Sequence, residues 1–306
     1  MNRRSALLAA GLSAAAVSTT PADAGRPTSS QTLRPGLGGM VRAADGAELF
    51  TTDWGAGRPV VFLSGLGLPS DMWDYQRAPM SRRGLRCVAY DRRGHGRSSI
   101  PNDGYGFDSL ADDLDAVLAA LSLRDVVLVG HSMAGGEIVR YLTRHAAGRV
   151  SKLVLVSTAA TPGVLQSASN PNGPTKAQFE AYLDGVIAKD VAVWAEENAA
   201  PFFAPDTPAA TRAWLTRMLT RTSLKAIYDC NQTMATADFA AELATIRLPT
   251  LVIHGDKDVS APVERGRQTA ALIPGARFVV YEGAPHGLFV THRERLTADL
   301  QAFALS

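Results

Sequence analysis

Cysteine is scarce in this sequence, whose 306 residues contain only Cys87 and Cys230. There is no C-x-x-C pair and no Cys/His cluster at metal-ligand spacing, so the sequence predicts neither a disulfide scaffold nor a zinc site. Cys87 lies in a short apolar run typical of a buried strand, and Cys230 follows helical sequence far away in the chain. We therefore expect both thiols to be free and buried.

An excess of charge is also missing. The 31 basic and 29 acidic side chains give a net charge of +2 and are interspersed along the chain, so nucleic acid is not expected as a partner. No G-x-x-x-x-G-K-S pattern is present to bind phosphate, and no cofactor is expected. With 46% hydrophobic and 20% charged residues, the chain can bury a large core without a metal or a disulfide.

No apolar run is long enough to anchor the chain in a membrane. The run over 6–17 has about a dozen residues, whereas a transmembrane helix needs about 20. It follows Arg3-Arg4 and precedes an A-x-A site at Ala22-Asp23-Ala24, which together predict a cleaved signal peptide over residues 1–24. We expect export to the periplasm or the medium, and the paired arginines favour the twin-arginine route over the general one. We expect residues 25–36 to form a loosely structured leader before the folded domain.

Short apolar runs alternate with helical patterns along the rest of the chain. The runs are rich in β-branched residues and lack polar alternation, as is typical of strands buried on both faces of a parallel sheet. Asp45-Gly46 predicts a hairpin turn before them. The predicted strands are 59–64, 85–90, 126–129, 152–157, 250–254 and 277–281, and the predicted helices are 110–121, 133–145, 263–272 and 292–304. This alternation predicts an α/β fold with a mostly parallel sheet flanked by helices.

The alternation stops between residues 161 and 246. An Asn/Pro/Gly-rich stretch at 170–174 begins a helical region without strand-like runs, and Leu248-Pro249 ends it. We predict a helical lid inserted between two parts of the core, 37–160 and 247–306. Its large apolar side chains either pack against the core or line a pocket. They are Trp194, Phe202, Phe203, Trp214, Met218 and Tyr228.

Ser132 is the candidate nucleophile. It follows the predicted strand 126–129 on a turn of small residues and precedes a predicted helix that starts near Met133. A serine on such a turn presents its hydroxyl above the sheet. The usual pattern has a second glycine where this chain has Ala134. The alternative role for Ser132 is a helix N-cap, but the small residues on both sides favour the nucleophile.

A nucleophilic serine needs a base to take its proton. Of the six histidines, His286 is the best candidate, because it lies in a small-residue loop after the last predicted strand. The other histidines are expected in different roles. His131 should point away from the serine, His95 should organise neighbouring loops, His254 should be structural, and His145 and His292 should lie on helices.

The base in turn needs a carboxylate to orient it. The predicted strand 250–254 leads into Gly255-Asp256-Lys257-Asp258, and spacing alone does not choose between Asp256 and Asp258. Either acid gives the chain order serine, acid, histidine, which differs from the orders of chymotrypsin and subtilisin. Asp91, in an arginine-rich turn, is expected in a structural ion pair.

Two backbone N–H groups are expected to stabilise the oxyanion of an acyl-transfer intermediate. The N–H of Met133 lies at a predicted helix N-terminus. The second is expected from Leu66, in the glycine-containing loop that follows the predicted strand 59–64. Trp73, just beyond this loop, either walls an acyl pocket or lies in the core.

Taken together, these segments resemble the cofactor-free (non-haem) haloperoxidases and their arylesterase-like relatives of the α/β-hydrolase fold. The resemblance implies an α/β-hydrolase fold, Asp258 rather than Asp256 as the acid, no cofactor, and free cysteines. It covers nearly the whole chain after the leader and rests on Tyr90-Asp91-Arg92-Arg93-Gly94-His95-Gly96-Arg97-Ser98, Gly130-His131-Ser132-Met133-Ala134-Gly135-Gly136-Glu137, Pro201-Phe202-Phe203, Tyr228-Asp229-Cys230 and Gly283-Ala284-Pro285-His286-Gly287.

The oxyanion loop departs from this family. The family usually has His-Gly, an aromatic residue and Pro where this chain has Ser64-Gly65-Leu66-Gly67. In the family, hydrogen peroxide releases the acyl group from the serine as a peracid, and the resemblance implies that the proline favours peroxide. With Gly67 in that position, we expect hydrolysis of a small-molecule carboxylic ester or lactone through an acyl-enzyme. The alternatives are peracid formation, as in a haloperoxidase or perhydrolase, and ligand binding without turnover.

Overall fold

The computed structural model describes residues 36, 38–145, 147–158, 163–167, 170–171 and 173–306. Contacts divide the chain into Met1–Gln31, which is not described, and Thr32–Ser306, which holds every element named below. The predicted signal peptide and all of the predicted leader except Gly36 therefore lie outside the described residues.

Within the described residues, eight strands form one sheet in the order β1-β2-β4-β3-β5-β6-β7-β8. β1 and β2 form the predicted hairpin, β2 is antiparallel to β4, and all other neighbouring strands are parallel. The predicted fold class is thus confirmed. The strands are β1 (Gly39–Arg42), β2 (Glu48–Trp54), β3 (Arg58–Leu63), β4 (Leu85–Tyr90), β5 (Val126–His131), β6 (Val150–Val156), β7 (Thr250–Gly255) and β8 (Arg277–Tyr281).

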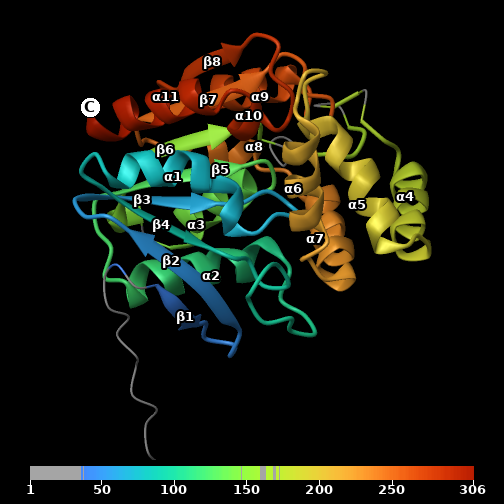
Figure 1. Cartoon of the computed structure of the whole chain (residues 1–306), viewed down its shortest axis with the longest axis horizontal. Coiled ribbons are helices and arrows are strands. Elements are labelled where there is room, and N and C mark those ends of the chain that lie inside the picture. The colour runs from blue at the N-terminus through green and yellow to red at the C-terminus, as the bar shows by residue number, and fades with distance from the viewer. Residues whose placement is uncertain (1–35, 37, 146, 159–162, 168–169, 172) are drawn as a thin grey trace, which may run out of the picture. The chain divides into compact units, whose positions relative to one another are not determined.

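Helices cover both faces of the sheet (Figure 1). Successive strand residues project to opposite faces, so Val61 and Val88 join one core with α2 (Phe107–Ala120) and α3 (Ala134–Arg144). Val60 and Cys87 join the other with α1 (Asp74–Ser81) and α11 (Arg293–Leu305). Shorter or more peripheral elements are η1 (Ser70–Trp73), η2 (Ala147–Arg149), α8 (Ala240–Leu243), α9 (Val263–Leu272) and α10 (Leu288–Thr291).

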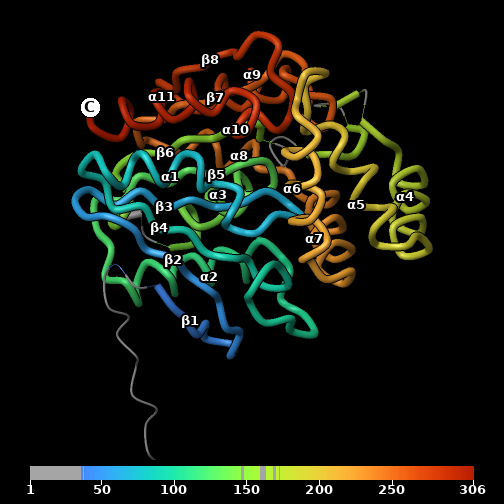
Figure 2. The backbone as a smooth tube through the Cα atoms, in the orientation of Figure 1, coloured from blue at the N-terminus to red at the C-terminus, as the bar shows by residue number. Residues whose placement is uncertain are grey.

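Among the described residues, five helices and one short 3₁₀ helix lie between β6 and β7, in the segment predicted as an insert. One of them, α8, packs against α3 and α9. The others are α4 (Lys176–Ala188), α5 (Val191–Ala199), η3 (Ala200–Phe202), α6 (Ala209–Leu219) and α7 (Leu224–Thr236). Figure 1 shows them beside the carboxyl ends of the strands, toward which the arrowheads of β3 and β6 point. The backbone tube in Figure 2 shows the loop after β3 next to the α6–α7 connection, where Thr222 Oγ1 donates a hydrogen bond to Gly67 O (2.9 Å).

β8 and α1 differ from the sequence-based expectation. β8 was expected to be buried on both faces, but it is the edge strand, and Val280 is 37% exposed. α1 was not expected, because it carries Pro79 and because two of the side chains it buries, Gln76 and Arg77, are polar.

Both cysteines are free and fully buried, as predicted. Burial raises the pKa of each thiol to about 12. Among the described residues, none of the helices combines the length and the apolar character needed to cross a bilayer.

Candidate active site

Ser132 lies at the sharp turn between β5 and α3. Its φ of 55° is in the left-handed region, where a non-glycine residue costs roughly 1–3 kcal/mol, so the surroundings have to hold it. Ser132 N donates to Val156 O (2.9 Å) on the neighbouring strand. A Cβ on Gly130 would lie 2.6 Å from Ile138 Cδ1 and 3.2 Å from the Ala134 carbonyl, so a larger residue there would have to displace the end of the Ile138 side chain. Ala134 is fully buried, so the turn accommodates its extra methyl group.

The imidazole of His286 lies beside this serine. His286 follows β8, and its Nε2 is 3.0 Å from Ser132 Oγ. Its Nδ1 is 2.7 Å from Asp258 Oδ2. Because an ionised carboxylate only accepts hydrogen bonds, Nδ1 carries the proton and Nε2 is left to accept from the serine hydroxyl. The three side chains are at most 8% exposed, so water is largely excluded from this chain of hydrogen bonds.

The carboxylate of Asp258 is held in one orientation. Its Oδ1 accepts from Ser260 N (3.0 Å) and Ala261 N (2.8 Å), which leaves Oδ2 facing the imidazole. Burial by itself raises the pKa of Asp258, but the adjacent His286 and hydrogen bonds from side chains and backbone outweigh burial and hold it well below its usual range. Asp256, the other candidate, accepts instead from Gly283 N (2.7 Å) and fixes the turn that precedes His286.

Two further buried histidines support the site. His254 has the structural role expected of it, whereas sequence reasoning missed the role of His131. His254 Nε2 donates to Ala261 O (2.7 Å) and lies 3.4 Å from Asp258 Oδ2. His131 was expected to point away from the serine. Instead, its ring centroid is 4.6 Å from that of His286, and its Nε2 donates to His286 O (3.0 Å). Burial, reinforced by His286, lowers the pKa of His131 to about 3, so its ring is neutral and holds the His286 backbone.

The loop after β3 approaches the serine closely. A Cβ on Gly65 would lie 3.3 Å from Ser132 Cβ. In the part of the chain that the structure describes, the backbone N–H groups of Leu66 and Met133 donate to no other protein atom, so both are available to a ligand. The next N–H, that of Gly67, donates to His95 Nε2 (3.2 Å).

A cavity of about 250 Å³ opens beside Ser132. Trp73 is not among the described residues that line it, which corrects the predicted pocket wall. Its indole donates to Leu63 O (3.2 Å) at the end of β3, and the side chain is fully buried in the core. The lining residues are Gly65, Leu66, His131, Ser132, Val164, Phe179, Tyr182, Trp194, Asn198, Pro201, Phe202, Leu219, Asn231, Met234, Ser260, Arg265 and His286.

Most of this wall comes from the inserted helices. Of the lid side chains expected to pack or to line a pocket, Trp194 and Phe202 line it. Arg265, from α9, was not foreseen, because nothing in a single helical pattern tells which side chain faces a cavity. Among the described residues, no aspartate or glutamate lines the cavity, and no group of three or more His, Cys, Asp or Glu side chains is placed to hold a metal ion.

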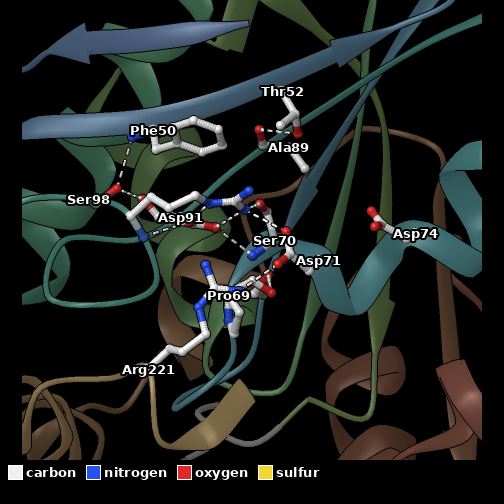
Figure 3. Close-up of polar contacts among 12 residues, drawn as sticks. Phe50, Thr52, Pro69, Ser70, Asp71, Asp74, Ala89, Asp91, Ser98 and Arg221 are labelled. Carbon is white, nitrogen blue, oxygen red and sulfur yellow. Dashed lines mark hydrogen bonds and ion pairs between the residues drawn. The ribbon is translucent and has the colours of Figure 1, made fainter. Parts of the chain in front are cut away.

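A polar cluster next to the oxyanion loop connects the core to the α6–α7 segment (Figure 3). Asp91 forms the predicted ion pair, with Arg97 Nε at 2.8 Å, and accepts from Ser70 N (2.7 Å). Asp71, the next residue along η1, pairs with Arg221 Nη1 (2.7 Å).

The connection continues beyond Arg221. Ser223 N donates to Gly94 O (2.8 Å) and Thr222 Oγ1 donates to Gly67 O. Side-chain and backbone contacts therefore fasten the start of α7 to the loops that follow β3 and β4.

Comparison with known proteins agrees with this architecture. A family described as "alpha/beta hydrolase fold" matches residues 58–293. A "Non-heme haloperoxidase" from Rhodococcus erythropolis is 40% identical over 86% of this chain and 98% of that protein. A "Bifunctional esterase/perhydrolase" from Acinetobacter calcoaceticus is 36% identical over 88% of this chain and 100% of its own length. The solved structure of an esterase from Exiguobacterium antarcticum superposes with a TM-score of 0.85 at 31% identity, covering 88% of this chain and 100% of that one. The chain therefore belongs to the α/β-hydrolase fold family and is related within it to the non-haem haloperoxidases and esterases.

Proposed function

We propose that the chain is a serine hydrolase that cleaves a small carboxylic ester or lactone through an acyl-enzyme. The observation that carries this proposal is the continuous set of contacts from Ser132 Oγ through His286 to Asp258, at 3.0 and 2.7 Å. A serine hydroxyl is a weak nucleophile at neutral pH, and this arrangement removes its proton as it attacks.

The proposed reaction has two halves. Ser132 Oγ attacks the acyl carbonyl, its proton passes to His286 Nε2, and Asp258 stabilises the resulting imidazolium. The oxyanion is placed to accept hydrogen bonds from the N–H groups of Leu66 and Met133. The intermediate collapses as His286 protonates the leaving alkoxide, which in a lactone stays attached to the acyl group. His286 then takes a proton from water, the hydroxide attacks the acyl-enzyme, and collapse returns the proton to Ser132.

The cavity favours a short acyl group. Its volume of about 250 Å³ is below the roughly 300–1,000 Å³ of pockets that bind drug-sized ligands. We expect p-nitrophenyl acetate and butyrate to be hydrolysed with higher kcat/KM than the decanoate.

The test is initial-rate hydrolysis of these esters by the wild-type protein and by Ser132→Ala. Removing the serine should lower kcat by about 10⁶-fold, in effect to the background, and should abolish covalent labelling by a fluorophosphonate. Equal rates for the two proteins would refute the proposal. Binding of the esters without turnover or labelling would favour a non-catalytic binding protein.

A second activity, peracid formation, is supported by the relatives named above as a haloperoxidase and an esterase/perhydrolase. It uses the same acyl-enzyme with hydrogen peroxide in place of water. Peroxide- and bromide-dependent bromination of a dye in carboxylate buffer, absent in Ser132→Ala, would establish it.

We also propose that residues 1–24 direct export by the twin-arginine route. The sequence supports this through Arg3-Arg4, the apolar run and the A-x-A site. Arg3→Lys with Arg4→Lys should retain the protein in the cytoplasm in a fractionation experiment. Unchanged export would point to the general route.

A further inference from the structure

The peptide bond that carries the Leu66 N–H is held from behind by a buried arginine. Arg92 Nη1 donates to Gly65 O (3.2 Å), and Arg92 Nη2 donates to Ser64 O. In a trans peptide the C=O and the following N–H point in opposite directions. With the Gly65 carbonyl turned toward Arg92, the Leu66 N–H is turned the other way, away from the guanidinium.

The same guanidinium is tied to the helix that carries the other donor. Arg92 Nε donates to Glu137 Oε1 (2.6 Å), and Glu137 lies in the first turn of α3, which begins directly after Met133. Arg92 is 2% exposed and Glu137 is 1% exposed. One buried ion pair therefore connects the loop of Leu66 with the helix start at Met133.

Such a pair is a poor source of stability. Withdrawing two charges from water costs about as much as their attraction returns, and apolar replacements of similar volume are often equally stable. What an apolar pair cannot do is donate to two backbone carbonyls and so fix the direction of a peptide. The contacts that distinguish Arg92 from an apolar residue are those to Ser64 O and Gly65 O.

We propose that Arg92, held by Glu137, is a positioning residue that aims the Leu66 N–H at the oxyanion and sets its distance from the Met133 N–H. This inference rests on the proposed hydrolase function. Arg92 contacts no reacting atom, and its effect is transmitted through the Gly65–Leu66 peptide. Its loss should therefore lower kcat while leaving KM nearly unchanged, because an oxyanion exists only after attack has begun.

The experiment compares three variants of the full chain. Arg92→Lys keeps the charge but replaces the planar fork, whose Nε, Nη1 and Nη2 reach Glu137, Gly65 O and Ser64 O, with a single ammonium nitrogen. Arg92→Met with Glu137→Leu removes the whole pair at similar volume. The matched control is Arg93→Met with Asp113→Leu. That pair starts from the neighbouring residue, is equally buried (1% for both side chains), and is joined by hydrogen bonds of 2.7 and 2.6 Å.

The readouts are kcat, KM and the inhibition constant of a phenylboronic acid, which forms a tetrahedral adduct with the serine. Removing an oxyanion donor typically costs about 10²–10³-fold in kcat. We expect kcat to fall roughly 10-fold in Arg92→Lys and roughly 10²-fold in the double variant, and the affinity for the boronate to fall by the same factors. The control should stay within about 3-fold of the wild type, since its pair does not contact the oxyanion loop.

Equal kcat and boronate affinity in a folded Arg92 variant would overturn the inference, as would an equal loss in the control. Hydrogen–deuterium exchange over residues 64–67 gives a readout that does not need activity, and it should accelerate in Arg92→Lys but not in the control. Unchanged exchange would likewise overturn the inference. If the wild-type protein shows no Ser132-dependent turnover, the proposed function fails, while exchange still decides whether Arg92 holds this loop.

Discussion

Replacing Asp258 by asparagine would convert a carboxylate that only accepts hydrogen bonds into an amide with a fixed orientation. Two backbone N–H groups, those of Ser260 and Ala261, point at Oδ1, so the amide oxygen has to occupy that position. The NH₂ group then takes the position of Oδ2 and faces His286 Nδ1. Two donors cannot face each other, so the imidazole proton moves from Nδ1 to Nε2. Nε2 then cannot accept the proton of the Ser132 hydroxyl.

The size of the effect follows from the geometry. At an effective dielectric constant of about 20, two unit charges about 4 Å apart attract by ~4 kcal/mol, which is roughly 10³-fold in rate. The wrong tautomer adds to this loss, and in serine proteases the corresponding change lowers kcat by about 10⁴-fold. We expect Asp258→Asn to lose between about 10³- and 10⁴-fold in kcat for p-nitrophenyl acetate.

Asp256→Asn is the matched control, two residues away on the same loop. Its carboxylate accepts from Gly283 N rather than contacting His286, so kcat should change by less than about 3-fold, a small fraction of the loss expected when the imidazole partner is removed. Melting temperatures establish that both variants are folded. An Asp258→Asn protein that keeps more than a tenth of the activity would refute the assigned role of Asp258, and so would an equal loss in Asp256→Asn.

Three further predictions concern backbone conformation, acid stability and thiol chemistry. Gly67→Pro should lower the melting temperature and kcat without creating bromination activity, because Gly67 has a φ of 80° and proline is fixed near −65°. Burial lowers the pKa of His95 and of His131 to about 3. Between about pH 3 and 6.5 the unfolded state binds protons that the folded state does not, so the free energy of unfolding should fall on acidification across this window, and less steeply in His95→Asn. The free energy of unfolding is measured by urea titration at several pH values. An equal dependence on pH in the two proteins would contradict this prediction. Cys87 and Cys230 should react with a disulfide reagent only after denaturation, and rapid reaction of the native protein would contradict their burial.

Much of the fold could be predicted from local sequence because a parallel sheet leaves a continuous apolar run for each buried strand. The runs around Val60, Val127 and Leu251 were each found within a few residues of their observed bounds. The edge position of β8 could not be found in this way. Phe278 and Val279 look like residues of a central strand, and only the strand order places them at the rim.

Ser132 and His286 were found for a similar reason, since each is bracketed by small residues that a sharp turn or loop requires. Asp258 was preferred to Asp256 only through the resemblance to the haloperoxidases. The supporting side chains carry no such signal. Arg92 lies in an arginine-rich turn that indicated a structural role for its neighbour Asp91, and its contact with Gly65 O depends on how two loops from different strands pack. Trp73 could not be assigned from the sequence either. The short helix η1 that carries it decides whether the indole faces the core or the cavity.

The attachment of the α6–α7 connection to the core restricts how the inserted helices can move. Thr222 is bound to the oxyanion loop itself, Ser223 to Gly94 in the loop after β4, and Arg221 to Asp71 in η1. A rotation about this end would pull Gly67 and disturb the site. Trp194, on α5, lies next to this attachment, because a Cβ on Gly67 would be 3.5 Å from Trp194 Cη2. α4 and α5 in turn pack against α7 and α6. Any movement of α6 or α7 that enlarges the cavity for a larger substrate, or for product release, is therefore also transmitted to the oxyanion loop.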